Sequence, residues 1–136
     1  MRDRVGSIYG LVDPRYGIIR YVGQTVVDLQ TRLRDHVREA RTSNPAYPKM
    51  TWVRFLLSHG LQPKPVLLAY GIPVPFITHL QVGNTFRPFY DFGALDKEEC
   101  LFIEITKGEC EAAGIRGVNS EVRASAGIYT GRPMTE

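Results

Sequence analysis

The chain has 136 residues, of which 43% are hydrophobic and 23% are charged, a composition that fits a globular protein and excludes wholesale disorder. This length predicts a single domain with one core, spanning residues 1–136. The net charge is only +3, but residues 1–64 carry 11 Lys and Arg against 5 Asp and Glu, whereas residues 65–136 carry 6 against 9. The basic first half favours a polyanionic partner such as nucleic acid, although a solvated basic surface gives the same count.

Several broad classes are disfavoured. Cys100 and Cys110 are too few for a disulfide framework and lack the paired spacing of a metal site, which favours a reducing compartment. No apolar run follows the first charged residues, so we expect no signal peptide and a cytoplasmic location. The longest apolar stretch, residues 65–82, is interrupted by prolines, a glycine and polar residues, so we expect no membrane span.

The first elements predict a β-hairpin. Residues 5–12 are rich in strand-forming side chains, residues 13–17 have the composition of a turn, and residues 18–22 resume the strand pattern. A five-residue loop places Tyr9 directly opposite Tyr21, so the two phenols should lie side by side on one face of the sheet.

Two helices are predicted next. Asp28 has the place of an N-cap for a helix from about residue 29 to residue 41, in which Arg32 and His36 lie one turn apart on neighbouring positions of one face. The apolar stripe expected to be buried consists of Leu29, Leu33, Val37 and Ala40. A second helix is predicted over residues 49–59, with a glycine directly after its end.

The second half contains a less readable segment. Residues 65–70 have the composition of a third strand, while residues 71–95 mix glycine, proline and aromatic residues and predict either a long loop or an insertion that contains strands. Residues 96–111 predict a helix that begins with a capping box formed by Asp96 and Glu99. The expected core face of this helix consists of Leu101, Phe102 and Ile105.

The order of these pieces resembles the GIY-YIG nuclease superfamily. The matching residues are Ile8-Tyr9, Tyr21-Val22-Gly23, Arg32 with His36 four positions later, Glu99 on the last predicted helix, and Asn119. The resemblance covers about residues 5–120 and depends on order and spacing. It departs from the family at Ser7, where the family has glycine, and in the length of the segment before the last helix. A Gly-Ile-Tyr at residues 127–129 is interpreted as coincidence, because only seven residues follow it.

This resemblance implies an α/β (α+β) fold: a small three-stranded antiparallel sheet flanked by helices, with residues 71–95 as an insertion into a core of about residues 5–120. It implies hydrolysis of DNA phosphodiester bonds with one divalent cation, Mg²⁺ or Mn²⁺, in a protein of bacterial or phage origin. Specificity would come from the insertion, from a homodimer or from a partner protein. The alternatives are a catalytically inactive nucleic-acid-binding module and a protein-interaction module that uses the aromatic residues of segment 86–92.

The resemblance also implies roles for the catalytic set, which consists of Tyr9, Tyr21, Arg32, His36 and Glu99. Tyr9 would act as general base, for which a neighbouring cation such as Arg32 or the metal must lower its ordinary pKa of about 10. Arg32 would bind the phosphate, because a guanidinium stays charged and donates two parallel hydrogen bonds. Tyr21 and His36 would organise protons, and Glu99, with Glu98 as the fallback, would hold the cation.

Four further residues are expected to bind or support the substrate: Gly23, Arg34, Arg38 and Asn119. For Gly23 the expected reason is the absence of a Cβ, which permits close approach of another group. Ordinary structural roles also fit the catalytic and substrate-binding candidates. The tyrosines could serve packing, the arginines could be solvated helix residues, Glu99 could be a helix cap and Asn119 a turn residue.

Overall fold

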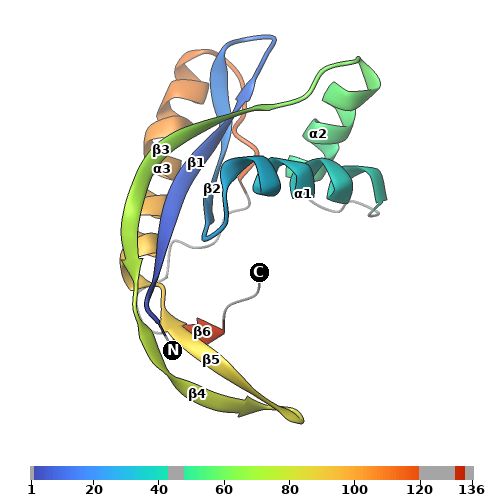
Figure 1. Cartoon of the computed structure of the whole chain (residues 1–136). Coiled ribbons are helices and arrows are strands. Elements are labelled where there is room, and N and C mark those ends of the chain that lie inside the picture. Colours follow the sequence, from blue (N-terminus) through green and yellow to red (C-terminus); the bar gives the residue numbers. More distant parts are fainter. Residues whose placement is uncertain (1, 43–47, 120–130, 134–136) are drawn as a thin grey trace.

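The computed structural model describes residues 2–42, 48–119 and 131–133, and this part of the chain contains three helices and two three-stranded antiparallel sheets (Figure 1). The predicted α+β fold with a small three-stranded sheet and flanking helices is confirmed. None of the helices in these residues is both long enough and apolar enough to cross a membrane.

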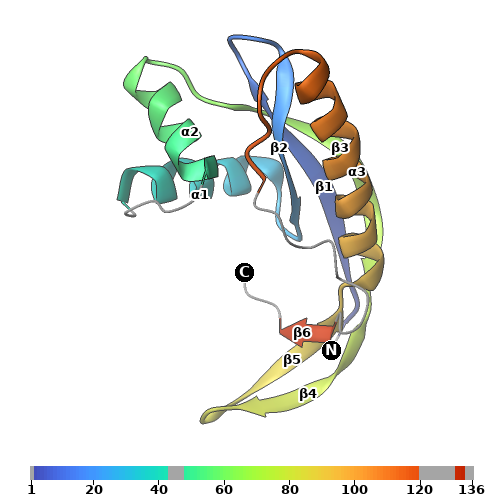
Figure 2. The same cartoon turned by 180° about the vertical axis from the view of Figure 1, so that it is seen from behind.

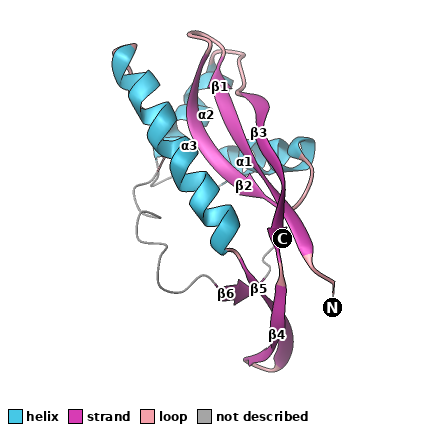
Figure 3. Ribbon diagram, turned by 90° about the vertical axis from the view of Figure 1, so that its left-hand side faces the viewer, coloured by secondary structure: helices cyan, strands magenta, loops and turns pink. Residues whose placement is uncertain are grey.

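The first sheet has β1 (Arg4–Asp13) between β2 (Ile18–Thr25) and β3 (Lys64–Val74). Helices cover both of its faces: α1 (Leu29–Thr42) and α2 (Pro48–Ser58) on one side and α3 (Gly93–Ala112) on the other (Figure 3). Successive side chains of β1 therefore enter different cores. Tyr9 packs with α1 and α2, whereas Ile8 packs with α3.

The β1–β2 hairpin is confirmed, but its predicted register is wrong. Tyr9 lies opposite Gly23 and not opposite Tyr21, which pairs with Leu11. The reason is a bulge in the ladder after Leu11 together with a turn that leaves Asp13 paired with β2. Because Tyr21 and Gly23 are two positions apart, both phenols still project from the same face of the sheet.

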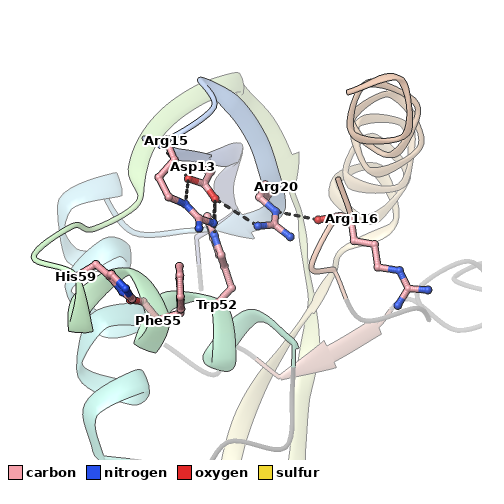
Figure 4. A network of polar contacts seen from close by, with 7 residues as sticks. All are labelled: Asp13, Arg15, Arg20, Trp52, Phe55, His59 and Arg116. Atoms are coloured by element: carbon pink, nitrogen blue, oxygen red, sulfur yellow. Dashed lines mark hydrogen bonds and ion pairs between the residues drawn. The ribbon is translucent and has the colours of Figure 1, made fainter. Parts of the chain in front are cut away.

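The turn is held by the buried carboxylate of Asp13, which connects three parts of the fold (Figure 4). Its oxygens accept hydrogen bonds from Arg15 and Arg20 of the hairpin and, at 2.9 Å, from the indole nitrogen of Trp52 on α2. Arg20 in turn donates to the carbonyl of Arg116, 2.8 Å away. Burial acts to raise the pKa of Asp13, but the hydrogen bonds from Arg15, Trp52 and Arg20 outweigh it and hold that pKa well below its ordinary value.

Helix α1 (Leu29–Thr42) begins as predicted. Asp28 accepts a hydrogen bond from the backbone N–H of Thr31 at 2.9 Å and another from its hydroxyl at 2.8 Å. The predicted stripe faces the core, with Leu33 and Ala40 buried and the other two members partly buried against them.

Helix α2 (Pro48–Ser58) also lies where it was expected. Gly60 follows it with a φ of 72°, and the N–H of Leu61 donates to the carbonyl of Leu56 at 2.8 Å, which ends the helix. Trp52, which is only 5% exposed, joins the core between α2 and the hairpin.

The segment before α3 is the strand-bearing insertion and not the long loop. It forms β4 (Phe76–Val82) and β5 (Thr85–Asp91), and β6 (Gly131–Pro133) completes a second sheet in the order β4-β5-β6. Figure 1 shows β3 continuing into β4, so that the second sheet extends from one end of the first along an arc. The Gly-Ile-Tyr at residues 127–129 lies outside the described residues.

Helix α3 (Gly93–Ala112) lies along the first sheet, as Figure 2 shows from behind, but its predicted start is wrong and its predicted core face is right only for Phe102, which packs against the core. It begins three residues before Asp96, so Asp96 is not its cap and no capping box forms. Leu101 and Ile105 are more than half exposed. The buried residues are instead Leu95, Asp96, Glu99, Thr106 and Cys110.

The difference between the predicted and the observed buried face of α3 has a physical cause. The buried acids at its start have polar partners from other elements, so the helix buries a partly polar face and leaves apolar residues in solvent.

Candidate active site

Three aromatic side chains from three elements form a cluster on the face of the first sheet that α1 covers. The ring centroids of Tyr9 and Tyr21 are 6.2 Å apart, and that of His36 is 5.8 Å from the first and 5.5 Å from the second. The hydroxyl of Tyr9 is hydrogen-bonded to Nε2 of His36 at 2.5 Å. Tyr9 is 1% exposed and His36 is fully buried, so this contact is shielded from solvent.

Gly23 makes the cluster sterically possible. It pairs with Tyr9 across the ladder, and a Cβ at this position would overlap the Tyr9 hydroxyl and lie 2.9 Å from Cε2 of Tyr21. Glycine is therefore required for the phenols to lie over the strand. The close approach expected at Gly23 is made by the protein's own tyrosines.

Two cations lie next to this cluster. Arg32, one turn before His36, interacts with the phenol of Tyr9 and is also 3.9 Å from Asp35. Lys49, in the first turn of α2, places its ammonium 5.1 Å from the ring centroid of Tyr21 and 4.0 Å from Glu39. The side chain of Lys49 is only 14% exposed.

Lys49 was not identified from the sequence. It lies on a different helix from the Arg32–His36 pair. The only local feature that could have drawn attention to it is a positive charge at the N-terminal end of a helix, where positive charge is unfavourable.

Burial and charge set the protonation of the cluster. Burial, the neighbouring Tyr21 and Glu99 raise the pKa of Tyr9 far above its ordinary value, and the opposing effect of Arg32 is smaller. Burial, with the positive charges of Lys49 and Arg32, lowers the pKa of His36 to about 3. In the free protein, Tyr9 is therefore a neutral phenol and His36 a neutral imidazole at neutral pH. Arg32 lowers the pKa of Tyr9 as expected, but burial outweighs it, so the net shift is upward.

The pKa of Lys49 is itself lowered by burial and by Arg32, against the effect of Glu39. A largely buried lysine with a shifted pKa beside the aromatic cluster is a candidate functional residue.

Glu99 projects from α3 and is 5% exposed. It belongs to the helix layer on the other face of the sheet from Arg32 and His36, and its charge is the smallest of the named effects on the pKa of Tyr9. Its Oε1 accepts a hydrogen bond of 3.3 Å from Nε2 of Gln24, the residue after Gly23. The sequence interpretation assigned no role to Gln24.

Asn119 is bound to the backbone of β2. Its amide donates to the carbonyl of Val22 at 2.7 Å and accepts from the N–H of Val22 at 2.9 Å. This double contact fastens the segment after α3 to the strand that carries Tyr21 and Gly23. Arg34 and Arg38 are both exposed on α1, and Arg38 forms an ion pair of 2.8 Å with Asp35.

The donor set limits which cation would fit. Among the described residues there is no group of three or more His, Cys, Asp or Glu side chains that would enclose a metal. A single buried carboxylate such as Glu99 suits a hard cation like Mg²⁺, which keeps several waters and takes further oxygens from a phosphate. Glu99 therefore suits the expected cation, with waters as its remaining ligands until a phosphate replaces some of them.

No protein-family model, no curated protein and no solved structure matches this chain. The functional assignment therefore depends on the resemblance of the motifs and on the geometry of the residues described above.

Proposed function

We propose that this chain is a metal-dependent DNA endonuclease domain of the GIY-YIG type, which hydrolyses phosphodiester bonds. The observation that carries the proposal is the contact of Tyr9, Tyr21 and His36, three residues of separate motifs, next to the Arg32 guanidinium. Packing alone does not require two phenols and an imidazole in a buried cluster beside two partly exposed cations. The two free cysteines, one of them buried, agree with an intracellular location for this activity.

Each residue has a role that follows from its chemistry. Arg32 binds the scissile phosphate and stabilises the charge that develops in the transition state. Glu99 holds the divalent cation, which when bound polarises the phosphate and stabilises the leaving oxygen. Lys49 adds positive potential at the same position.

Tyr9 and His36 handle the proton of the attacking water. Tyr9 accepts this proton as its own hydroxyl proton passes to Nε2 of His36, so that a free phenolate does not accumulate. A bound phosphate offsets the positive charges of Arg32 and Lys49, which raises the pKa of His36 and prepares it to receive the proton.

Cleavage of supercoiled plasmid, with and without Mg²⁺, tests this function. We expect nicked or linear product only with the cation. Replacement of Arg32 with Ala should lower the rate by about 10²–10³-fold, as for the loss of one transition-state donor. The exposed Arg4 is the matched control, and Arg4→Ala should cleave at the wild-type rate.

A titration with labelled DNA, added to the cleavage assay, separates the alternatives. An inactive nucleic-acid-binding module would bind labelled DNA in a salt-dependent manner without cutting it, and a protein-interaction module would do neither. Of the aromatic residues that the second alternative would use, Tyr90 and Phe92 are buried in the core and Phe86 is 72% exposed. Branched and single-stranded substrates in the same panel show whether cleavage depends on DNA structure.

A further inference from the structure

Gln24 lies between two buried carboxylates at the start of α3. Its Nε2 donates to Oδ1 of Asp96 at 2.7 Å and to Oε1 of Glu99 at 3.3 Å. The two acids are one helical turn apart, and both are at most 5% exposed. The amide group thus bridges the two acids and is in contact with Oε1 of Glu99.

Arg132 of β6 determines which way this amide points. Its two terminal nitrogens are each 2.7 Å from an oxygen of Asp96, and one of them is 3.3 Å from Oε1 of Gln24. A guanidinium only donates and a carboxylate only accepts, so the amide oxygen must face Arg132 and the amide nitrogen must face the acids. The ring of Phe92, 4.1 Å from the guanidinium carbon, supports Arg132 in this place.

The charges of Arg132 and Asp96 and the neutral amide of Gln24 favour a ligand role for Glu99. Arg132 compensates the charge of Asp96 through a two-pronged ion pair, which reduces repulsion between the two neighbouring acids. Gln24 is neutral, so its own contact with Glu99 adds no positive charge that would compete with a cation. A carboxylate that binds a cation needs both properties, a fixed position and a retained negative charge.

We propose that Gln24 is a positioning residue for Glu99 as a cation ligand, and that Arg132 and Asp96 act on the cation site by orienting Gln24. This inference rests on the proposed role of Glu99. It makes β6, which the sequence did not predict, part of the support of the site.

Binding of Mn²⁺ to the full chain without DNA, measured by electron paramagnetic resonance of the free ion, tests the proposal. We expect the wild type to bind Mn²⁺ and Glu99→Gln to lose this binding. Gln24→Ala should bind about tenfold more weakly, as is usual for loss of a group that orients a ligand. Gln62→Ala, at an exposed position in the loop after α2, is the matched control and should bind as the wild type does.

A double-mutant cycle tests the path through Gln24. Arg132→Gln alone should weaken Mn²⁺ binding. In the Gln24→Ala background it should cause no further loss of affinity, because the side chain that Arg132 orients is already absent. Thermal melting checks that each variant folds, and Gln24→Asn, which shortens the side chain by one methylene, replaces Gln24→Ala if the latter does not fold.

The outcomes separate this inference from the nuclease proposal. Unchanged Mn²⁺ affinity in the Gln24 variants, additive effects of the two substitutions, or no Mn²⁺ binding by the wild type would overturn it. Mn²⁺ binding that depends on Gln24, in a protein that leaves every DNA substrate intact, would support the positioning role and contradict the nuclease.

Discussion

The hydroxyl of Tyr9 on β1 is hydrogen-bonded to Nε2 of His36 on α1, and neither side chain is more than 1% exposed. This contact joins the first strand to the helix that carries Arg32. Its two members have pKa values shifted in opposite directions by burial, so both are neutral in the free protein. The predictions below test this contact and the groups around it.

Removal of the Tyr9 hydroxyl should damage cleavage more than folding. Tyr9→Phe keeps the ring but leaves a nitrogen of the buried His36 without its hydroxyl partner, which costs about 1–3 kcal/mol of unfolding free energy. Cleavage should fall by about 10²–10⁴-fold, the usual contribution of a general base. Urea unfolding and plasmid cleavage measure the two effects. Cleavage at the wild-type rate would contradict the role of Tyr9.

The depressed pKa of His36 predicts how stability depends on pH. The unfolded chain takes up a proton near pH 6.5, whereas folded His36 does so only at about pH 3, so the folded state binds fewer protons between these values. Stability should therefore fall as the pH is lowered through this window, by up to about 1.4 kcal/mol per pH unit from this group. Unfolding free energies at pH 7 and pH 5 measure the slope, and His36→Gln should flatten it.

Lys49 should contribute to the lowered pKa of His36, although burial is the larger cause. Replacement of Lys49 with Met removes one of the two positive charges that lower the His36 pKa, so this pKa should rise, as followed by NMR of the imidazole. Lys64→Met is a control at an exposed lysine to which no shift of His36 is attributed. An unchanged His36 pKa in Lys49→Met would show that Lys49 has no part in lowering it.

Gly23 should tolerate no side chain. Gly23→Ala would force the new methyl group against the Tyr9 hydroxyl and the Tyr21 ring, with an expected cost of about 1–3 kcal/mol and a loss of cleavage. Gly108→Ala is a control in which the same substitution should have the opposite effect on stability. It lies in α3 with no atom within 4 Å of the added group, so it should stabilise the protein by about 0.5–1 kcal/mol. Chemical denaturation of both variants tests the pair.

Asp13 predicts a second, more acidic loss of stability. Its pKa is lowered in the folded state, so it stabilises the protein above its unfolded value of 3.8, and this contribution is lost as the pH falls further. Asp13→Asn should remove it. Trp52 donates to this carboxylate, so its fluorescence should report the loosening of the hairpin from α2. A wild-type acid transition in Asp13→Asn would show that Asp13 has no part in it.

The sequence predicted those parts of the fold that have strong local signals. Asp28 caps α1 as expected, and Gly60 ends α2, because a side-chain cap and a left-handed glycine act within one turn of the chain. Tyr9 and Tyr21 meet as expected even though the predicted register was wrong, because the true register keeps them on the same face.

The parts that were not predicted depend on distant contacts. The face of α3 that is buried is set by partners of Asp96 and Glu99 rather than by apolar spacing. Arg132 and Gln24 are 108 positions apart, and no local pattern in either segment indicates that they meet. The high pKa of Tyr9 follows from burial, which depends on the packing of α1 and α2 against β1.

The most direct test of the central claim compares plasmid cleavage by the wild type, Glu99→Gln and Glu104→Gln in the presence of Mg²⁺. Glu104 is an exposed acid on the same helix and serves as the matched control. We predict metal-dependent cleavage by the wild type and by Glu104→Gln, and none by Glu99→Gln. Full cleavage by Glu99→Gln, or no metal-dependent cleavage by the wild type, would contradict the proposal that Glu99 and the aromatic cluster form a nuclease active site.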